Sequence, residues 1–128
     1  MGLDMFAWRV KAEDAIGDFE IAKNDDSMKV EEFFYWRKHH DLHGWMEELY
    51  RAKGGTKESF NCVPVLLTLD DLSALEFDLM NRMLPETKGF FFGDNPPDDE
   101  SMNRDLEFIQ MAKGIIAAGD MVYYDSWW

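Results

Sequence analysis

The segment TLDDLSALEFDLMNRMLP, residues 68–85, carries the clearest helix signal in the chain. Thr68 and Asp71 have the spacing of a capping box, in which each side chain accepts a hydrogen bond from the backbone N–H of the other residue. Pro85 cannot continue a helix, so the helix must end before it. The apolar residues recur at helical intervals of three and four: Leu72, Leu75, Leu79 and Met83. The segment therefore predicts an amphipathic helix that packs on a core.

Two further helices are predicted on either side of this segment. Residues 28–53 follow a helical pattern that ends at Gly54-Gly55. Residues from Pro97 to Gly119 begin with proline and three acidic side chains, which favour a helix N-terminus. The apolar side of this helix is expected to consist of Met102, Leu106, Ile109 and Ile116. Three helices are therefore expected.

Strand candidates occupy both ends of the chain and the stretches between the helices. They are rich in aromatic and β-branched residues and are bounded by turn residues: 3–10, 15–21, 60–67 and 120–128. The segment KGFFFGDNPP, 88–97, is expected to be a short aromatic strand or a loop. The pattern predicts an α+β fold for residues 1–128 as one domain, with about three helices packed on a small, mainly antiparallel sheet.

The charge balance excludes several classes of partner. The 128 residues include 26 acidic and 13 basic side chains, for a net charge of −13. Direct binding to nucleic acid or to an anionic membrane requires a basic surface, so neither is expected. No apolar run approaches the roughly 20 residues of a membrane span. Asp4 and Arg9 interrupt any signal-peptide core, and the single cysteine, Cys62, has no disulfide partner, so we expect a cytoplasmic protein.

The stretch WRKHHDLHGWMEE, residues 36–48, contains every histidine of the chain. If the whole of 28–53 is helical, an aromatic and polar strip runs along one side of it. Such a mixture of apolar walls and polar groups is typical of small-molecule sites. The candidate ligand-binding residues are Trp36, Arg37, His40, His43 and Glu47.

A divalent metal site is the alternative interpretation of the same stretch. His39, His43 and Glu47 are spaced one helical turn apart, so two imidazoles and a carboxylate could converge on one ion. The arrangement is similar to the H-E-x-x-H motif of metalloproteases, but His40 stands where that motif has its catalytic glutamate. The usual structural role of such histidines is hydrogen bonding within a packed helix. No cofactor other than this metal is indicated.

Four blocks of sequence together resemble a known group of proteins. These blocks are the MGLDM start, the YWRK segment with a following histidine, GFFFG at 89–93 and the tyrosine- and tryptophan-rich end. They are similar to a family of small uncharacterised proteins from bacterial and phage genomes. No activity is established for that family, so the resemblance implies no mechanism. It implies a shared site at Trp36, Arg37, His43 and the GFFFG segment.

These observations favour a binding protein over an enzyme. We expect a non-enzymatic module that binds a protein or a small molecule, and a homodimer is compatible with the composition. The first alternative is a metal-dependent hydrolase centred on His39, His43 and Glu47. The second is an acidic decoy that occupies a nucleic-acid-binding protein, as the net charge allows. The terminal YYDSWW is expected either to complete the sheet or to present an aromatic anchor to a partner.

Overall fold

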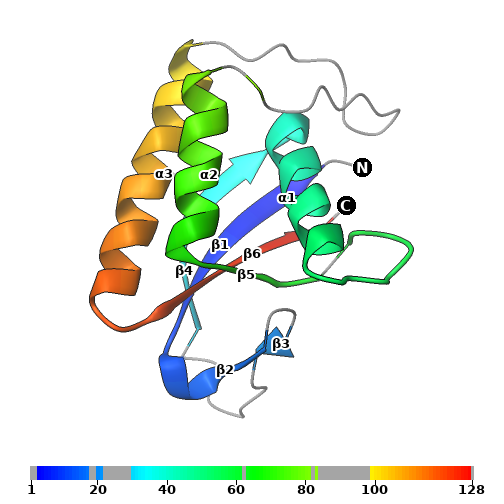
Figure 1. Cartoon of the computed structure of the whole chain (residues 1–128), viewed down its shortest axis with the longest axis vertical. Coiled ribbons are helices and arrows are strands. Elements are labelled where there is room, and N and C mark those ends of the chain that lie inside the picture. Colours follow the sequence, from blue (N-terminus) through cyan, green and yellow to red (C-terminus); the bar gives the residue numbers. More distant parts are fainter. Residues whose placement is uncertain are drawn as a thin grey trace.

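The computed structural model describes residues 3–17, 20–21, 30–61, 63–81, 83 and 99–127. Its regular elements are β1 (Asp4–Val10), a 3-10 turn (Ala12–Asp14), β2 (Ala15–Gly17), β3 (Glu20–Ile21), β4 (Val30–Arg37), α1 (His40–Ala52), β5 (Val65–Leu67), α2 (Leu69–Met80), α3 (Asp99–Ala117) and β6 (Met121–Trp127) (Figure 1). The predicted α+β class is confirmed.

The main sheet has four strands in the order β4-β1-β6-β5, and every neighbouring pair is antiparallel. The first and last strands of the chain therefore lie side by side at its centre. The segment 15–21, predicted as one strand, instead forms the short pair β2 and β3. The Tyr123 hydroxyl of β6 donates a hydrogen bond of 2.7 Å to the Gly17 carbonyl and so ties this pair to the sheet.

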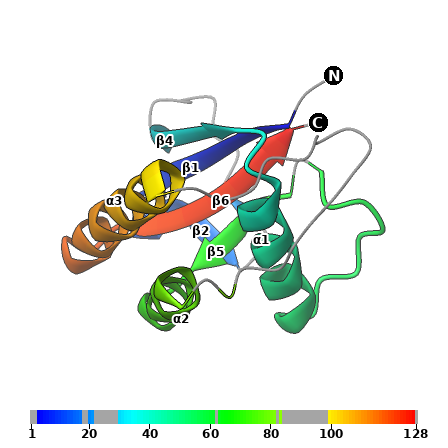
Figure 2. The same ribbon diagram turned by 90° about the horizontal axis from the view of Figure 1, so that it is seen from above.

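All three helices cover the same face of the main sheet (Figures 1 and 2). Their apolar sides and the inward side chains of the strands form one buried core, whose fully enclosed members include Leu3, Met5, Ala7, Leu42, Met46, Leu72, Leu75, Phe108, Ile109 and Val122. The opposite face of the sheet bears no helix in the described part of the chain. None of the described helices is long and apolar enough to cross a lipid bilayer.

The predicted helix over 28–53 is wrong in its first half. Residues Val30–Arg37 form strand β4, and the helix begins only at His40. The run Phe33 to Trp36 consists of aromatic side chains, which favour a pleated strand, and seven of the eight residues of β4 pair with β1. Lys38 then adopts a positive φ of 59°, and its N–H bonds the Leu3 carbonyl at 2.8 Å, which turns the chain from the sheet into α1.

The helix predicted after Thr68 is confirmed with its capping box. The Asp71 N–H donates to Thr68 Oγ1 at 3.1 Å, and the Thr68 N–H donates to Asp71 Oδ2 at 2.9 Å. Leu72, Leu75 and Leu79 are buried as predicted. Met83 is not, because the helix ends at Met80 and leaves its side chain 59% exposed. Pro85, Cys62 and the GFFFG segment lie outside the described residues.

The third helix and the C-terminal strand are also present. Gly119 follows α3 with a φ of 99°, a left-handed conformation that ends the helix. Ile109 is buried as predicted, but Met102, Leu106 and Ile116 are half-buried, and Phe108, Ala112 and Ile115 are enclosed instead. The aromatic end forms β6 between β1 and β5, and Trp127 at its tip is 63% exposed.

Candidate functional site

The five candidate ligand-binding residues do not form one strip. Trp36 and Arg37 lie on strand β4, whereas His40, His43 and Glu47 lie on α1. Because neighbouring residues of a strand face opposite sides of the sheet, Trp36 is buried against the helices and Arg37 is exposed on the other side. His40 and His43 are buried, and Glu47 pairs with Arg51 at 3.4 Å on the surface. The predicted strip depended on a continuous helix, which the chain does not form.

Trp36 and His39 instead hold a buried carboxylate. Asp105 of α3 is 1% exposed, and both of its oxygens are bonded. The Trp36 indole Nε1–H donates to Asp105 Oδ1 at 3.0 Å, and His39 Nε2 lies 2.6 Å from Oδ2. These two contacts offset the hydration that the carboxylate loses on burial. They also join the end of β4 and the start of α1 to α3.

Asp105 was missed in the sequence, although a signal for it exists. It precedes Phe108, Ile109 and Ala112 by three, four and seven residues and therefore lies on the buried side of the helix. An acidic residue on an apolar stripe predicts a buried hydrogen-bonded carboxylate.

His43 is buried beside the aromatic ring of Tyr124. Its Nδ1 lies 2.7 Å from the Tyr124 hydroxyl, and its ring is 5.1 Å from that of Phe60. Burial lowers the pKa of His43 from 6.5 to about 4, and burial raises the pKa of Tyr124 well above its ordinary value. The imidazole is therefore neutral at pH 7. A general acid or base works best with a pKa near the working pH, so this pair suits packing rather than catalysis.

The burial of His43 makes the stability of the fold dependent on pH. Between pH 6.5 and 4 the unfolded chain protonates this imidazole and the folded chain does not, so the free energy of unfolding falls as pH falls. We expect the wild type to lose about 2 kcal/mol more than His43→Gln between pH 7.5 and pH 5. Urea unfolding at the two pH values measures this, with Glu48→Gln on the exposed side of α1 as control. Equal losses in wild type and His43→Gln would contradict the burial of a neutral His43.

The proposed metal ligands each have a different neighbour. His39 contacts Asp105, His43 contacts Tyr124 and Glu47 contacts Arg51. Across the residues that the structure describes, no group of three or more His, Cys, Asp or Glu side chains is arranged to hold a metal ion. The predicted triad His39, His43 and Glu47 is therefore not brought together.

The helix-free face of the sheet carries a group of aromatic side chains, of which Tyr35 and Trp127 are exposed and Phe6 and Trp8 are half-buried. Residues paired across antiparallel strands share a face, and Phe6 is paired with both Tyr35 and Asp125. The Phe6 and Trp8 rings stack at 5.4 Å, and the Phe6 and Tyr35 rings lie 5.5 Å apart. We call this surface the aromatic sheet face and define it by Asp4, Phe6, Trp8, Tyr35, Asp125 and Trp127.

Two carboxylates lie among these rings. The Tyr35 hydroxyl donates to Asp4, and this hydrogen bond raises the pKa of Tyr35. Asp125 accepts hydrogen bonds from the Ser126 N–H and from the Trp8 side chain. Partial burial nevertheless raises the pKa of Asp125 above its ordinary value. A positively charged ligand beside this carboxylate would offset its lost hydration.

The sequence contained a signal for this surface that the prediction did not use. In the strand at 3–10, Phe6 and Trp8 alternate with Met5 and Ala7, so two aromatic side chains must share the face opposite the core. This alternation does not show which other strands lie beside the strand at 3–10, because that depends on the order of strands in the sheet.

Comparison with known proteins finds no relative of this chain. No protein-family model, no curated protein and no solved structure matches it.

Proposed function

We propose that the chain is a non-enzymatic, cytoplasmic binding protein that engages a basic segment of another protein through the aromatic sheet face. The observation that carries this proposal is the pair of exposed rings, Tyr35 at 37% and Trp127 at 63%, beside the half-buried rings and the carboxylates of this face. Tyrosine and tryptophan contribute most of the affinity of many protein interfaces. Their concentration on the face that the helices leave uncovered favours recognition of a partner.

Rings and carboxylates together select a cationic partner. A lysine or arginine side chain over an aromatic face gains about 0.5–1 kcal/mol at an exposed site, and more where water is excluded. Phe6, Trp8 and Trp127 offer such faces, and Asp125 offers an opposite charge at their edge. Arg37 lies on the same face and Lys57 lies near Asp125, but the carboxylates of the face, which include Glu32, outnumber these cations, so an anionic partner would meet net repulsion.

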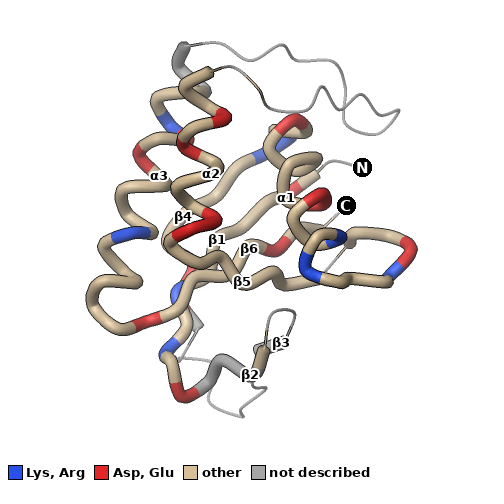
Figure 3. Tube along the Cα trace, viewed as in Figure 1, with Lys and Arg blue, Asp and Glu red and all other residues tan. Residues whose placement is uncertain are grey.

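The charge of the whole chain supports the same class of partner. The net charge is −13, and acidic positions occur on all three helices as well as on the sheet (Figure 3). A field of this sign attracts basic surfaces over a distance of about 8 Å at physiological ionic strength and repels the nucleic-acid backbone. The proposed partner is therefore a basic protein segment rather than DNA, RNA or an acidic peptide.

A titration with defined peptides tests the proposal. Short Gly/Ser peptides that contain spaced arginine or lysine are added to the protein, and glutamate peptides of the same length serve as the comparison. We expect tryptophan fluorescence to report binding of the basic peptides only, with weakening as salt is added. Trp127→Ala should weaken binding about tenfold through loss of an exposed aromatic anchor. Asp125→Asn should weaken it in the same direction.

Phe77→Ala provides the matched control. Phe77 is 61% exposed on α2, so its removal takes away a comparable aromatic surface on the helix side of the molecule. The proposal predicts unchanged peptide affinity in this variant. Equal affinity for acidic and basic peptides, or equal losses in Trp127→Ala and Phe77→Ala, would contradict it.

A further inference from the structure

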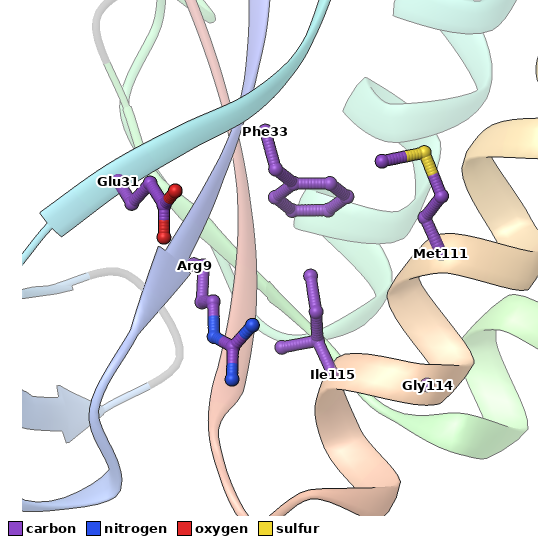
Figure 4. Close-up of a pocket in the computed structure, with 6 residues that line it drawn as sticks. All are labelled: Arg9, Glu31, Phe33, Met111, Gly114 and Ile115. Atoms are coloured by element: carbon purple, nitrogen blue, oxygen red, sulfur yellow. The ribbon is translucent and has the colours of Figure 1, made fainter.

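A pocket of about 390 Å³ lies on the helix side of the sheet, the face opposite the aromatic sheet face. It is lined by Arg9 of β1, Glu31 and Phe33 of β4, and Met111, Gly114 and Ile115 of α3 (Figure 4). This volume is at the lower end of the range of about 300–1,000 Å³ that is usual for small-molecule sites. Three local features of the chain create the pocket.

The first feature is a bulge in strand β4. Ala7 pairs with Phe34 but Trp8 pairs with Glu32, so Phe33 is an additional residue without a partner on β1. Regular alternation would place Phe33 and Phe34 on opposite faces. The bulge places both on the helix side, where their rings lie 5.9 Å and 5.6 Å from Phe108. Phe33 thereby becomes a wall of the pocket, which is a common use of such bulges.

The second feature is a glycine within helix α3. Glycine at an interior helical position costs about 1 kcal/mol relative to alanine. Close packing usually explains such a residue, but a Cβ atom at Gly114 would meet nothing within 4 Å. Packing therefore does not require glycine here. What its missing side chain does provide is open space between Met111 and Ile115, where the pocket lies.

The third feature is an arginine held in place. The Arg9 Nε–H donates to Asp120 Oδ2 at 2.7 Å, which orients the guanidinium group that lines the pocket. Glu31 is the strand neighbour of Arg9 and is exposed on the same side. Figure 4 shows these two charged groups on one side of the pocket and the apolar side chains of Met111 and Ile115 on the other.

We infer that this pocket binds a free α-amino acid with a large apolar side chain. Arg9, Asp120 and Glu31 together carry one net negative charge, so a simple anion is disfavoured and a zwitterion is accommodated. The ligand carboxylate would accept from the remaining guanidinium N–H groups of Arg9, and its ammonium would donate to Glu31. Its side chain would pack on Phe33, Ile115 and the pliable Met111.

The inference is tested by calorimetric titration of the full chain with methionine, leucine and phenylalanine at millimolar concentration. N-acetylmethionine and methioninamide, which lack one charge each, are the paired probes. We expect the free amino acids to bind and both derivatives to bind at least tenfold more weakly. Binding of methioninamide alone would show that the pocket recognises an amine and would contradict a zwitterionic ligand. If no amino acid bound, the whole inference would be wrong.

Two variants at one position separate the pocket from other surfaces. Gly114→Leu should fill the space and abolish binding, while Gly114→Ala adds one methyl group and should retain most of it. Both residues favour helix more than glycine does, so both variants are expected to fold. Glu31→Gln should weaken amino-acid binding about tenfold, because the ammonium group of the bound methionine would lose its carboxylate partner. Unchanged binding in Gly114→Leu would place the ligand elsewhere and contradict the inference.

Discussion

Asp105→Ala is expected to lower the free energy of unfolding by about 3–5 kcal/mol, as measured by urea unfolding at pH 7. The carboxylate is 1% exposed and accepts from the Trp36 indole while it contacts His39. Its removal leaves the buried Trp36 indole and the partly buried His39 imidazole without their partner, and the cost of their lost hydration is then not offset. The network joins β4, α1 and α3, so its loss should destabilise the whole fold.

Two variants define how this result is interpreted. Asp105→Asn keeps an oxygen for the Trp36 indole and an amide group for His39, so it should cost markedly less than alanine. Glu107→Ala removes an exposed acid from the same helix and should change stability by less than about 0.5 kcal/mol. If Asp105→Ala were as mild as Glu107→Ala, the clamp between the helices and the strand would not exist.

Phe108→Ala is expected to lower the free energy of unfolding by about 3–5 kcal/mol. Phe108 is fully buried, and its ring lies 4.7 Å from that of Trp36 in an edge-on arrangement. It also contacts Phe33, the additional residue of the bulge, and the adjacent Phe34. Truncation would remove the residue on which these three rings pack and leave a cavity in the core.

The matched control for this prediction is Phe77→Ala, which removes a 61% exposed ring and should cost less than about 1 kcal/mol. Thermal or urea unfolding of the two variants under the same conditions gives the comparison. A loss in Phe108→Ala no larger than that in Phe77→Ala would mean that α3 does not pack on β4 as described.

Each of the three histidines has a hydrogen-bonding contact within the fold. His39 belongs to the Asp105 network, His40 lies 3.3 Å from the Lys38 carbonyl, and His43 contacts Tyr124. His39 and His40 lie where the chain turns from β4 into α1, and His43 lies within α1, where it faces β6.

Local signals were sufficient where they did not depend on distant partners. The capping box at Thr68 and Asp71 acts within one helical turn, so the sequence predicts the start of α2 correctly. The composition of 120–128 likewise predicts strand β6. These parts of the fold require no knowledge of the tertiary arrangement.

The errors arose where tertiary pairing decides the local structure. Apolar residues in 28–53 fit a helical period, but β1 offers a strand edge that pairs with 30–37 and outweighs that local preference. Because 30–37 is a strand and not a helix, Trp36 and Arg37 lie on opposite faces of the sheet. The predicted site residues therefore do not share one surface. The pocket depended on a bulge and on the proximity of α3, neither of which has a sequence signature of its own.

The most direct test of the proposed function is to follow the indole N–H signals of the protein by ¹H–¹⁵N NMR while an arginine- and lysine-containing peptide is added. Trp8 and Trp127 lie on the aromatic sheet face, whereas Trp36 and Trp45 are buried and bonded to Asp105 and Asp78. The proposal predicts that the Trp8 and Trp127 signals shift with peptide concentration while those of Trp36 and Trp45 stay in place. Shifts confined to the buried pair, or no shift in any of the four, would contradict binding at this face.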